Sequence, residues 1–313
     1  MDLMPCRFIF FFKKNTVISL LVNRWLLILV LIIFGQSIAP VFASPEGSPG
    51  TSIAKATFQG DIEYSQNPEQ KLDVYFSQTV ATLPVVIFVH GGGWQIGDKD
   101  HHRDKGQFLV KNGFVCVIPE YRLAPKWKHP AQVQDIAAAV AWVVTNARRF
   151  GGDPEKIVLI GHSSGAHLTA LVSTNQRFLG EVSVDSARLK GVVLLDTEFF
   201  DLAAELKTTT KARRRKMIVD AFGTDPATLQ DASPMEHIDQ GKTLPCFHIL
   251  QAGARGNRGV NSRNFHETLK KNGHKADFIQ IPGKNHRDMH KDMVIQGDPV
   301  SDEVLKFIRV ATE

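Results

Sequence analysis

Cysteine is scarce in this chain, and its scarcity excludes two kinds of protein. The 313 residues contain three cysteines, Cys6, Cys116 and Cys246, with neither the density of a disulfide scaffold nor the spacing of a zinc module. Cys116 and Cys246 lie in apolar runs that have the character of central strands. We therefore expect both to be small buried side chains and not disulfide partners.

A strong charge of either sign is also missing. The formal net charge is +5 at pH 7, and charged residues make up 22% of the chain. No basic stretch is combined with an aromatic module that could stack on bases, so we expect no nucleic-acid partner. Internal repeats are absent too, and 43% hydrophobic residues are ample for one large core.

Long hydrophobic runs are lacking, although the N-terminal part contains a short one at residues 25–34. A membrane-spanning helix needs about 20 apolar residues, twice the length of this run. Its flanks have the features of an export signal. Basic residues precede it, at Lys13, Lys14 and Arg24, and a segment that fits small-residue cleavage follows it at residues 41–43. Residues 1–43 are therefore predicted to be a signal peptide or an uncleaved anchor, which implies a periplasmic or secreted protein. A misassigned start of the chain is the alternative.

The rest of the chain alternates apolar runs with helix-like stretches. Residues 44–52 form a Pro/Gly/Ser linker, and residues 53–313 form the predicted domain. The apolar runs expected to be strands are 53–58, 72–76, 83–89, 114–118, 156–160, 190–195, 246–250 and 276–281. This alternation predicts an α/β fold with a mainly parallel, doubly wound sheet, which binds ligands beyond the carboxyl ends of its strands. A polar stretch at about 198–239 is predicted to be a short cap-like excursion over that edge.

The stretch Gly161-His162-Ser163-Ser164-Gly165 has the form G-x-S-x-G, with an apolar run before it and a helix-like run after it. Strand, tight turn and helix form the context of a nucleophile elbow, in which flanking glycines make room for the sharp turn. Such a turn exposes Ser163 at the carboxyl end of the strand, against the positive end of the next helix. Ser163 is therefore predicted to be a nucleophile, although the pentapeptide alone also fits an ordinary turn.

A second glycine-rich segment, at residues 90–94 (HGGGW), follows the third predicted strand. Without a Cβ, glycine lets the backbone approach a substrate closely. Acyl transfer to a serine needs N–H donors for the negative oxygen that develops on the carbonyl. We predict that these donors are the backbone N–H groups of Gly92, Gly93 and Ser164.

A serine nucleophile also needs a base and a group that orients the base. In sheets of this kind the chain order is serine, acid, histidine. His286 fits the base, because it lies in a Gly/Asn loop after the last predicted strand.

The acid is expected after the strand at 246–250, but residues 251–261 contain no carboxylate. Asp196 is the best substitute, because it ends the strand next to the elbow strand and a loop carrying His286 can reach it. Asp201, Asp288 and a serine–histidine pair without an acid remain alternatives.

Several longer segments together resemble a known family. They are HGGGWQIGDK at 90–99, EYRLAP at 120–125, FGGDPEKIVLIGHSSGAHLTAL at 150–171 and PGKNH at 282–286. These segments resemble the α/β-hydrolase fold, specifically carboxylesterases with an HGGGW oxyanion motif. That group includes feruloyl-esterase-like proteins, the hormone-sensitive-lipase group and kynurenine formamidases. The resemblance implies Ser163 as nucleophile, His286 as base and an acid within residues 254–260, where this chain has none.

Other features allow both a functional and a plain structural interpretation. His167 is predicted to pack under the elbow, and His286 and His290 have i, i+4 spacing but no H-E-x-x-H pattern, so no metal site is predicted. The basic run at 211–216 is typical of a solvated helix face, or of a contact with an anionic surface or acidic substrate near the pocket mouth. Four side chains could line an acyl pocket or pack at an edge: Trp94, His101, His102 and Trp127.

Together these features predict a serine hydrolase that cleaves small or medium carboxylic esters through an acyl-enzyme. The expected partner is a small ester substrate, no cofactor is expected, and a membrane is contacted only through residues 1–43 if they stay uncleaved. An arylformamidase-type amide hydrolase and a non-catalytic binding protein of the same fold are the alternatives.

Overall fold

The computed structural model describes residues 56–78, 82–253 and 259–313. The chain divides into two units, Met1–Ser52 and Ile53–Glu313, and the described residues all belong to the second. The predicted export signal and linker lie outside the described residues. Among the helices that are described, none combines the length and the apolar character needed to cross a bilayer.

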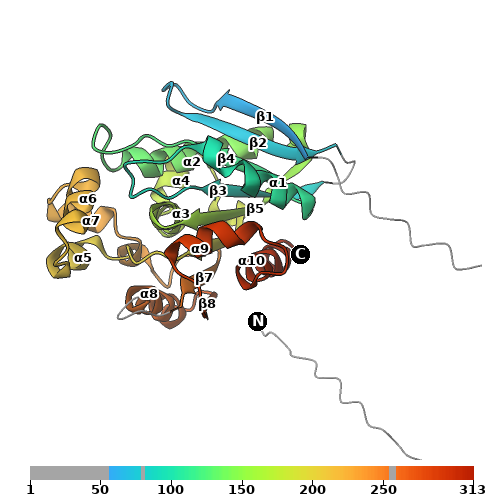
Figure 1. Ribbon diagram of the computed structural model, residues 1–313. Helices are drawn as coiled ribbons and strands as arrows, with labels where there is room; N and C mark the ends of the chain where they lie inside the picture. The colour runs from blue at the N-terminus through green and yellow to red at the C-terminus, as the bar shows by residue number, and fades with distance from the viewer. Residues whose placement is uncertain (1–55, 79–81, 254–258) are drawn as a thin grey trace, which may run out of the picture. The chain divides into compact units, whose positions relative to one another are not determined.

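In the described part of the chain, eight strands form one sheet in the order β1-β2-β4-β3-β5-β6-β7-β8 (Figure 1). The strands are β1 (Ala56–Glu63), β2 (Lys71–Ser77), β3 (Leu83–Val89), β4 (Val115–Pro119), β5 (Gly152–His162), β6 (Leu189–Leu195), β7 (Cys246–Ala252) and β8 (Ala276–Ile281). Strand β2 is antiparallel to both of its neighbours, and all pairs from β4 to β8 are parallel. The α/β-hydrolase fold class, with a mainly parallel sheet, is thereby confirmed.

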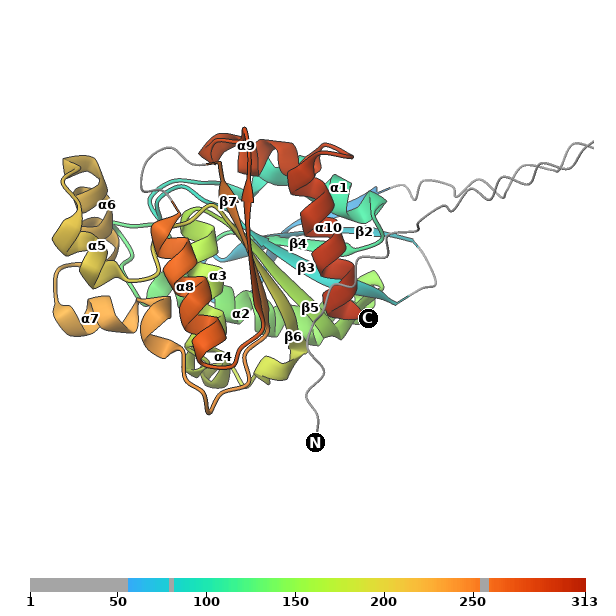
Figure 2. The same cartoon turned by 90° about the horizontal axis from the view of Figure 1, so that it is seen from below.

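Helices cover both faces of this sheet, because the central strands are apolar on both sides (Figure 2). In β3, Val85 and Ile87 face one core cluster, whereas Val86 and Phe88 face the other. The first cluster is completed by α2 (Ala131–Asn146), α3 (Ser164–Thr174), α4 (Arg177–Glu181) and α8 (Val260–Lys271). The second is completed by α1 (Arg103–Lys111), α9 (His286–Lys291) and α10 (Pro299–Thr312).

Some boundaries differ from the predicted ones. Helix α2 ends at Asn146, and a 3₁₀ turn follows up to Phe150. Strand β5 then starts at Gly152, because its first residues pair with the start of β3. Cys246, expected to be buried, is only half-buried, since it is the first residue of β7.

The polar stretch after β6 contains three helices that lie together beside the sheet (Figure 1). They are α5 (Leu202–Thr208), α6 (Ala212–Phe222) and α7 (Pro226–Asp231). The side chains of Asp201 and Asp225 accept backbone N–H bonds at the starts of α5 and α7. We call residues 198–239 the cap segment; it begins at the carboxyl edge of the sheet, where ligands bind in this class of fold.

A buried ion pair fixes the loop after β4 to helix α2. Asp135 is fully buried and accepts hydrogen bonds from the backbone N–H, the Nε and the Nη2 of Arg122, the shortest at 2.6 Å. The Gln70 amide donates to the same carboxylate at 2.5 Å. Because every buried charge needs partners, this cluster is a strong local constraint on the fold.

Candidate active site

Ser163 lies in a sharp turn between β5 and α3. Its backbone has φ 55° and ψ −118°, a conformation that L-residues rarely adopt. A Cβ built on Gly161 would lie 2.4 Å from the carbonyl oxygen of Gly165, and one built on Gly165 would lie 2.2 Å from that of Val89. Both flanking positions therefore require glycine, as the elbow interpretation of the pentapeptide assumed.

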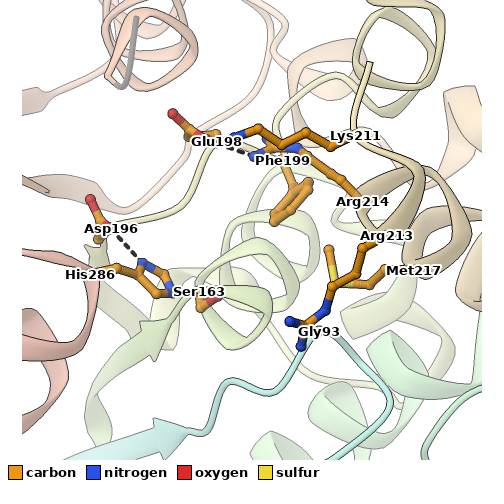
Figure 3. Close-up of a pocket in the computed structure, with 10 residues that line it drawn as sticks. All are labelled: Gly93, Ser163, Asp196, Glu198, Phe199, Lys211, Arg213, Arg214, Met217 and His286. Atoms are coloured by element: carbon orange, nitrogen blue, oxygen red, sulfur yellow. Dashed lines mark hydrogen bonds and ion pairs between the residues drawn. The ribbon is translucent and has the colours of Figure 1, made fainter. Parts of the chain in front are cut away.

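His286 is the first residue of α9, directly after the loop that follows β8, and its side chain approaches Ser163. Its Nε2 lies 3.1 Å from the Oγ of Ser163, and its Nδ1 lies 2.5 Å from Oδ2 of Asp196. Figure 3 shows the three side chains in a row at one side of a pocket. The imidazole is 40% exposed and can exchange protons with a ligand, while the carboxylate behind it is buried.

Asp196 is held more rigidly than the histidine. It directly follows β6, has φ 48°, and its backbone N–H donates to the Leu250 carbonyl at 2.8 Å. Its Oδ1 accepts the backbone N–H of Ala252 at 2.9 Å and a hydrogen bond from the Gln251 amide. These bonds leave the second carboxylate oxygen directed at the imidazole of His286.

The other carboxylates considered for this role have different partners. Asp201 caps α5 by accepting the backbone N–H of Ala204 at 2.9 Å. Asp288 belongs to a capping box at the start of α9, where it accepts the backbone N–H of Asn285 at 2.8 Å. Residues 254–258, which include most of the acid position implied by the family resemblance, lie outside the described residues.

The glycine segment after β3 lies against the elbow. A Cβ built on Gly91 would lie 3.1 Å from the Cβ of Ser163. Gly92 has φ 129° and Gly93 has φ 61°, so both adopt backbone conformations that favour glycine.

Across residues 56–78, 82–253 and 259–313, we find no hydrogen bond from the backbone N–H of Gly92 or Gly93. Ser164 opens α3, where a backbone N–H has no partner within the helix. The arrangement can therefore offer N–H donors beside the Oγ of Ser163.

His162 contacts His286, a role that the sequence did not suggest although the residue lies within the elbow. Its Nε2 donates to the carbonyl oxygen of His286 at 3.0 Å, and the two rings are 4.6 Å apart. Burial and the neighbouring imidazoles lower the pKa of His162 to about 3, so the ring is neutral. The neutral ring of His162 therefore fixes the backbone of His286 without placing a positive charge beside its imidazole.

The pocket above these residues has a volume of about 410 Å³. One side is formed by Ser163, Asp196 and His286, and Gly93 also lines the pocket. The facing wall belongs to the cap segment and consists of Glu198, Phe199, Lys211, Arg213, Arg214 and Met217 (Figure 3). The predicted site residues Ser163, Asp196, His286 and Gly93 thus line one pocket, whereas the cap residues that face them were not among those predicted.

None of the aromatic side chains proposed for an acyl pocket lines this one. Trp94 is fully buried, and its indole N–H donates to Nδ1 of His167 at 3.2 Å. Trp127 donates to Glu69 at 3.0 Å. His102 is buried against His290, with 3.1 Å between their ring nitrogens, and His101 is exposed.

His167 packs under the elbow and lies outside the hydrogen-bonded row of Ser163, His286 and Asp196. Its Nε2 donates to the Ala232 carbonyl at 2.8 Å, and complete burial lowers its pKa to about 3. Within the described residues, no three or more His, Cys, Asp or Glu side chains are placed to hold a metal ion.

A hydroxyl, an imidazole and a buried carboxylate in hydrogen-bonded series are the groups that acyl transfer requires. The imidazole can accept the hydroxyl proton, and the carboxylate stabilises the imidazolium that results. Backbone N–H groups beside the hydroxyl can bind the oxyanion of a tetrahedral intermediate.

The chain is similar to a known family and to several named hydrolases. The family model described as BD-FAE matches residues 72–256. The chain is 27% identical to a probable isoprenylcysteine alpha-carbonyl methylesterase of Oryza sativa, covering 79% of this chain and 61% of that protein. It is 26% identical to esterase LipC of Mycobacterium tuberculosis (82% and 67% covered) and 27% identical to kynurenine formamidase of Danio rerio (83% and 85%). The chain thus spans less than two thirds of the rice protein.

Solved structures show the same fold. Esterase B of Lactobacillus rhamnosis superposes with a TM-score of 0.70 at 22% identity, covering 82% of this chain and 86% of that one.

Proposed function

Because the chain belongs to the BD-FAE family, we propose that it is a serine hydrolase that cleaves small or medium carboxylic esters through an acyl-enzyme. The observation that carries the proposal is the hydrogen-bonded series Ser163–His286–Asp196, with 3.1 Å and 2.5 Å between successive groups. Similarity to named esterases supports the ester as the bond that is cleaved.

In this mechanism the Oγ of Ser163 attacks the ester carbonyl while Nε2 of His286 accepts its proton. The N–H groups of Gly92, Gly93 and Ser164 stabilise the oxyanion. His286 then returns the proton to the departing alcohol, which leaves the acyl group on Ser163. Water, deprotonated by the same imidazole, attacks the acyl-enzyme and releases the carboxylic acid. Asp196 keeps its negative charge throughout and stabilises the imidazolium.

The size of the pocket supports small or medium substrates. A volume of about 410 Å³ is at the lower end of the range for small-molecule sites, which is about 300–1,000 Å³. The cap segment supplies only short helices, so it offers limited cover for long acyl chains.

A second candidate is the hydrolysis of an N-formyl aromatic amine. The similarity to kynurenine formamidase, which extends over most of both chains, favours it. The same nucleophile and base would serve, with an amine in place of the alcohol as leaving group.

A fluorophosphonate probe tests for the nucleophile, since it labels only an activated serine. The purified wild-type chain should take the label, whereas Ser163→Ala should not, and its turnover should fall by about 10⁵-fold or more. Ser186→Ala is the matched control, because Ser186 lies in a turn before β6, at the opposite end of that strand from the pocket. A wild-type chain that takes no label would contradict the proposal and favour a non-catalytic binding protein.

Two substrate series separate the candidate reactions. Esters of 4-nitrophenol with short acyl chains test the esterase, and N-formyl derivatives of aromatic amines test the amidase. A kcat/KM higher for the formyl amides than for the esters would reject the first candidate in favour of the second.

We further propose that the protein is exported by residues 1–43. N-terminal sequencing of the protein recovered from outside the cytoplasm should begin at Ser44 if the signal is cleaved, and at the start of the chain if it is an anchor.

A further inference from the structure

We propose that the substrate carries a carboxylate, which the side chains of Lys211 and Arg213 bind at the pocket wall that faces Ser163. This inference rests on the proposed ester hydrolysis and narrows it to anionic esters.

Most charged groups of the pocket are already paired. Asp196 is bonded to His286, and Arg214 is bonded to Glu198 at 2.9 Å and to Glu205. The guanidinium of Arg214 also lies 4.5 Å from the centre of the Phe199 ring. Arg214 therefore has its counter-charges within the protein and is not a free cation for a ligand.

Lys211 and Arg213 differ from them. Both line the pocket with exposed side chains. Among the described residues, no carboxylate lies within ion-pair distance of either. The pocket thus presents two cations without a protein counter-charge.

The same basic run offers an internal comparison. Arg215 and Lys216 do not line the pocket, and each has a partner in the protein: Arg215 donates to the Leu206 carbonyl at 2.7 Å, and Lys216 pairs with Asp220 at 2.6 Å. The cations without partners are the ones that a ligand can reach.

These two cations do not stabilise the helix that carries them. Lys211 is the N-cap of α6 and makes no side-chain cap bond, and no acidic residue lies in the first turn. Cations are unfavourable there, because the N-terminus of a helix is its positive end. The other two helices of the cap segment begin instead with the capping carboxylates Asp201 and Asp225. A bound carboxylate would compensate both the positive charges of the two side chains and the positive end of the helix dipole.

The position of this wall relates the anion to the reacting bond. A Cβ built on Gly93 would lie 2.5 Å from the sulfur of Met217, so α6 packs directly against the glycine segment. In Figure 3 the guanidinium of Arg213 extends from α6 toward Gly93. A guanidinium can bind a carboxylate through two parallel hydrogen bonds, which also orients the ligand. The apolar groups of Phe199 and Met217 lie along the same wall and can contact the carbon chain between carboxylate and ester.

The test compares matched pairs of substrates that differ in one charge. On the acyl side the pair is 4-nitrophenyl hemisuccinate and 4-nitrophenyl butyrate; on the alcohol side it is 4-acetoxybenzoate and its methyl ester. For each pair, the ratio of kcat/KM for the anionic to the neutral ester is measured in wild type, Lys211→Gln, Arg213→Gln and the double variant. Lys216→Gln is the control, since it removes the same charge from the same helix outside the pocket.

We expect the wild-type ratio to exceed one for at least one pair and to decrease as salt is added. Each single variant should lower that ratio about fivefold and the double variant at least tenfold, which is the range for partly exposed charge-assisted contacts. Lys216→Gln should keep the wild-type ratio. Thermal unfolding of each variant verifies that the cap segment is intact.

The inference is overturned if the ratio is unchanged in the double variant. It is also overturned if Lys216→Gln lowers the ratio equally, because the basic run would then act on the substrate only through its overall positive charge. Hydrolysis of the neutral esters tests the proposed function separately. Neutral esters cleaved without any preference for the anionic ones would reject the carboxylate and retain the hydrolase. A wild-type chain that cleaves none of the four esters would reject both.

Discussion

Replacing Asp196 by asparagine tests the relay behind the nucleophile with a change of one atom. The Oδ1 of Asp196 accepts N–H groups from Ala252 and Gln251, so only an oxygen is tolerated at that position. In Asp196→Asn the amide oxygen must stay there, which turns the amide nitrogen toward Nδ1 of His286. That ring nitrogen must then accept a hydrogen bond, and the imidazole proton moves to Nε2, the atom that faces Ser163.

An imidazole that carries its proton on Nε2 cannot accept one from the serine. In serine proteases the equivalent change lowers kcat about 10⁴-fold, which corresponds to about 5 kcal/mol in activation free energy. We expect a loss of this size in Asp196→Asn, because its Nδ1–Oδ2 contact is short, at 2.5 Å, and the carboxylate is buried.

The assay measures steady-state kcat for a 4-nitrophenyl ester together with the rate of fluorophosphonate labelling, since both depend on the same base. Asp201→Asn is the matched control: Asp201 caps α5 and has no contact with His286, and asparagine is an equally good cap. Its kcat should stay within about twofold of wild type. If Asp196→Asn retained kcat within tenfold of wild type, Asp196 would not be the group that orients the imidazole of His286.

Three further predictions follow from single contacts. Gly92→Ala should lower kcat about 100-fold in an ester assay, because its Cβ would lie 1.7 Å from the carbonyl oxygen of Ile96 and displace an oxyanion donor. His167→Gln should reduce the loss of folding stability at acid pH. Burial lowers the pKa of His167 from 6.5 to about 3, so between these pH values the unfolded state binds a proton that the folded state does not. The free energy of unfolding of the wild type therefore falls as the pH falls through this range. The variant should remove up to about 1.4 kcal/mol of that loss per pH unit, measured by urea unfolding at pH 7, 6 and 5. Arg122→Met should lower the free energy of unfolding by about 3–5 kcal/mol, because it leaves the buried carboxylate of Asp135 without its cation; an unchanged urea midpoint would contradict this.

The elbow and the glycine segment were predictable because their constraints are local. Gly161 and Gly165 are required by the turn itself, whatever the rest of the chain does. His286 was also recognisable, because its position along the sequence, in chain order and after the last strand, is enough to single it out. Local backbone rules and a known sheet topology suffice for such residues.

The carboxylate that contacts His286 could not be identified from the sequence alone, because the choice depends on the three-dimensional positions of the side chains. Asp196, Asp201 and Asp288 all lie near the carboxyl edge by sequence, and only side-chain geometry separates them. Two of them act at helix ends, a role that single sequences rarely distinguish from catalysis. The structure brings the remaining one to the imidazole because β6 pairs directly with the elbow strand.

The facing wall of the pocket was not predictable for a different reason. A basic amphipathic helix is typical of a solvent-exposed surface, and nothing in its periodicity says what its exposed face looks toward. The orientation of α6 depends on Ile218, Ala221 and Phe222, which are buried in the core, and on its contact with the glycine segment. Trp94 was misjudged in a similar way, because its indole turns into the core, where it packs against Phe199 and Phe222.

The strained backbone of Ser163 and Asp196 sets stability and activity in opposition. Both residues directly follow neighbouring strands and have a positive φ, and such conformations cost about 1–3 kcal/mol each in residues other than glycine. Glycine at position 163 would release most of that strain, at a cost of about 0.5–1 kcal/mol in the entropy of the unfolded chain. Ser163→Gly would therefore be an inactive protein that melts at a higher temperature than the active one. A search for stabilised variants that did not also demand turnover would select against the nucleophile.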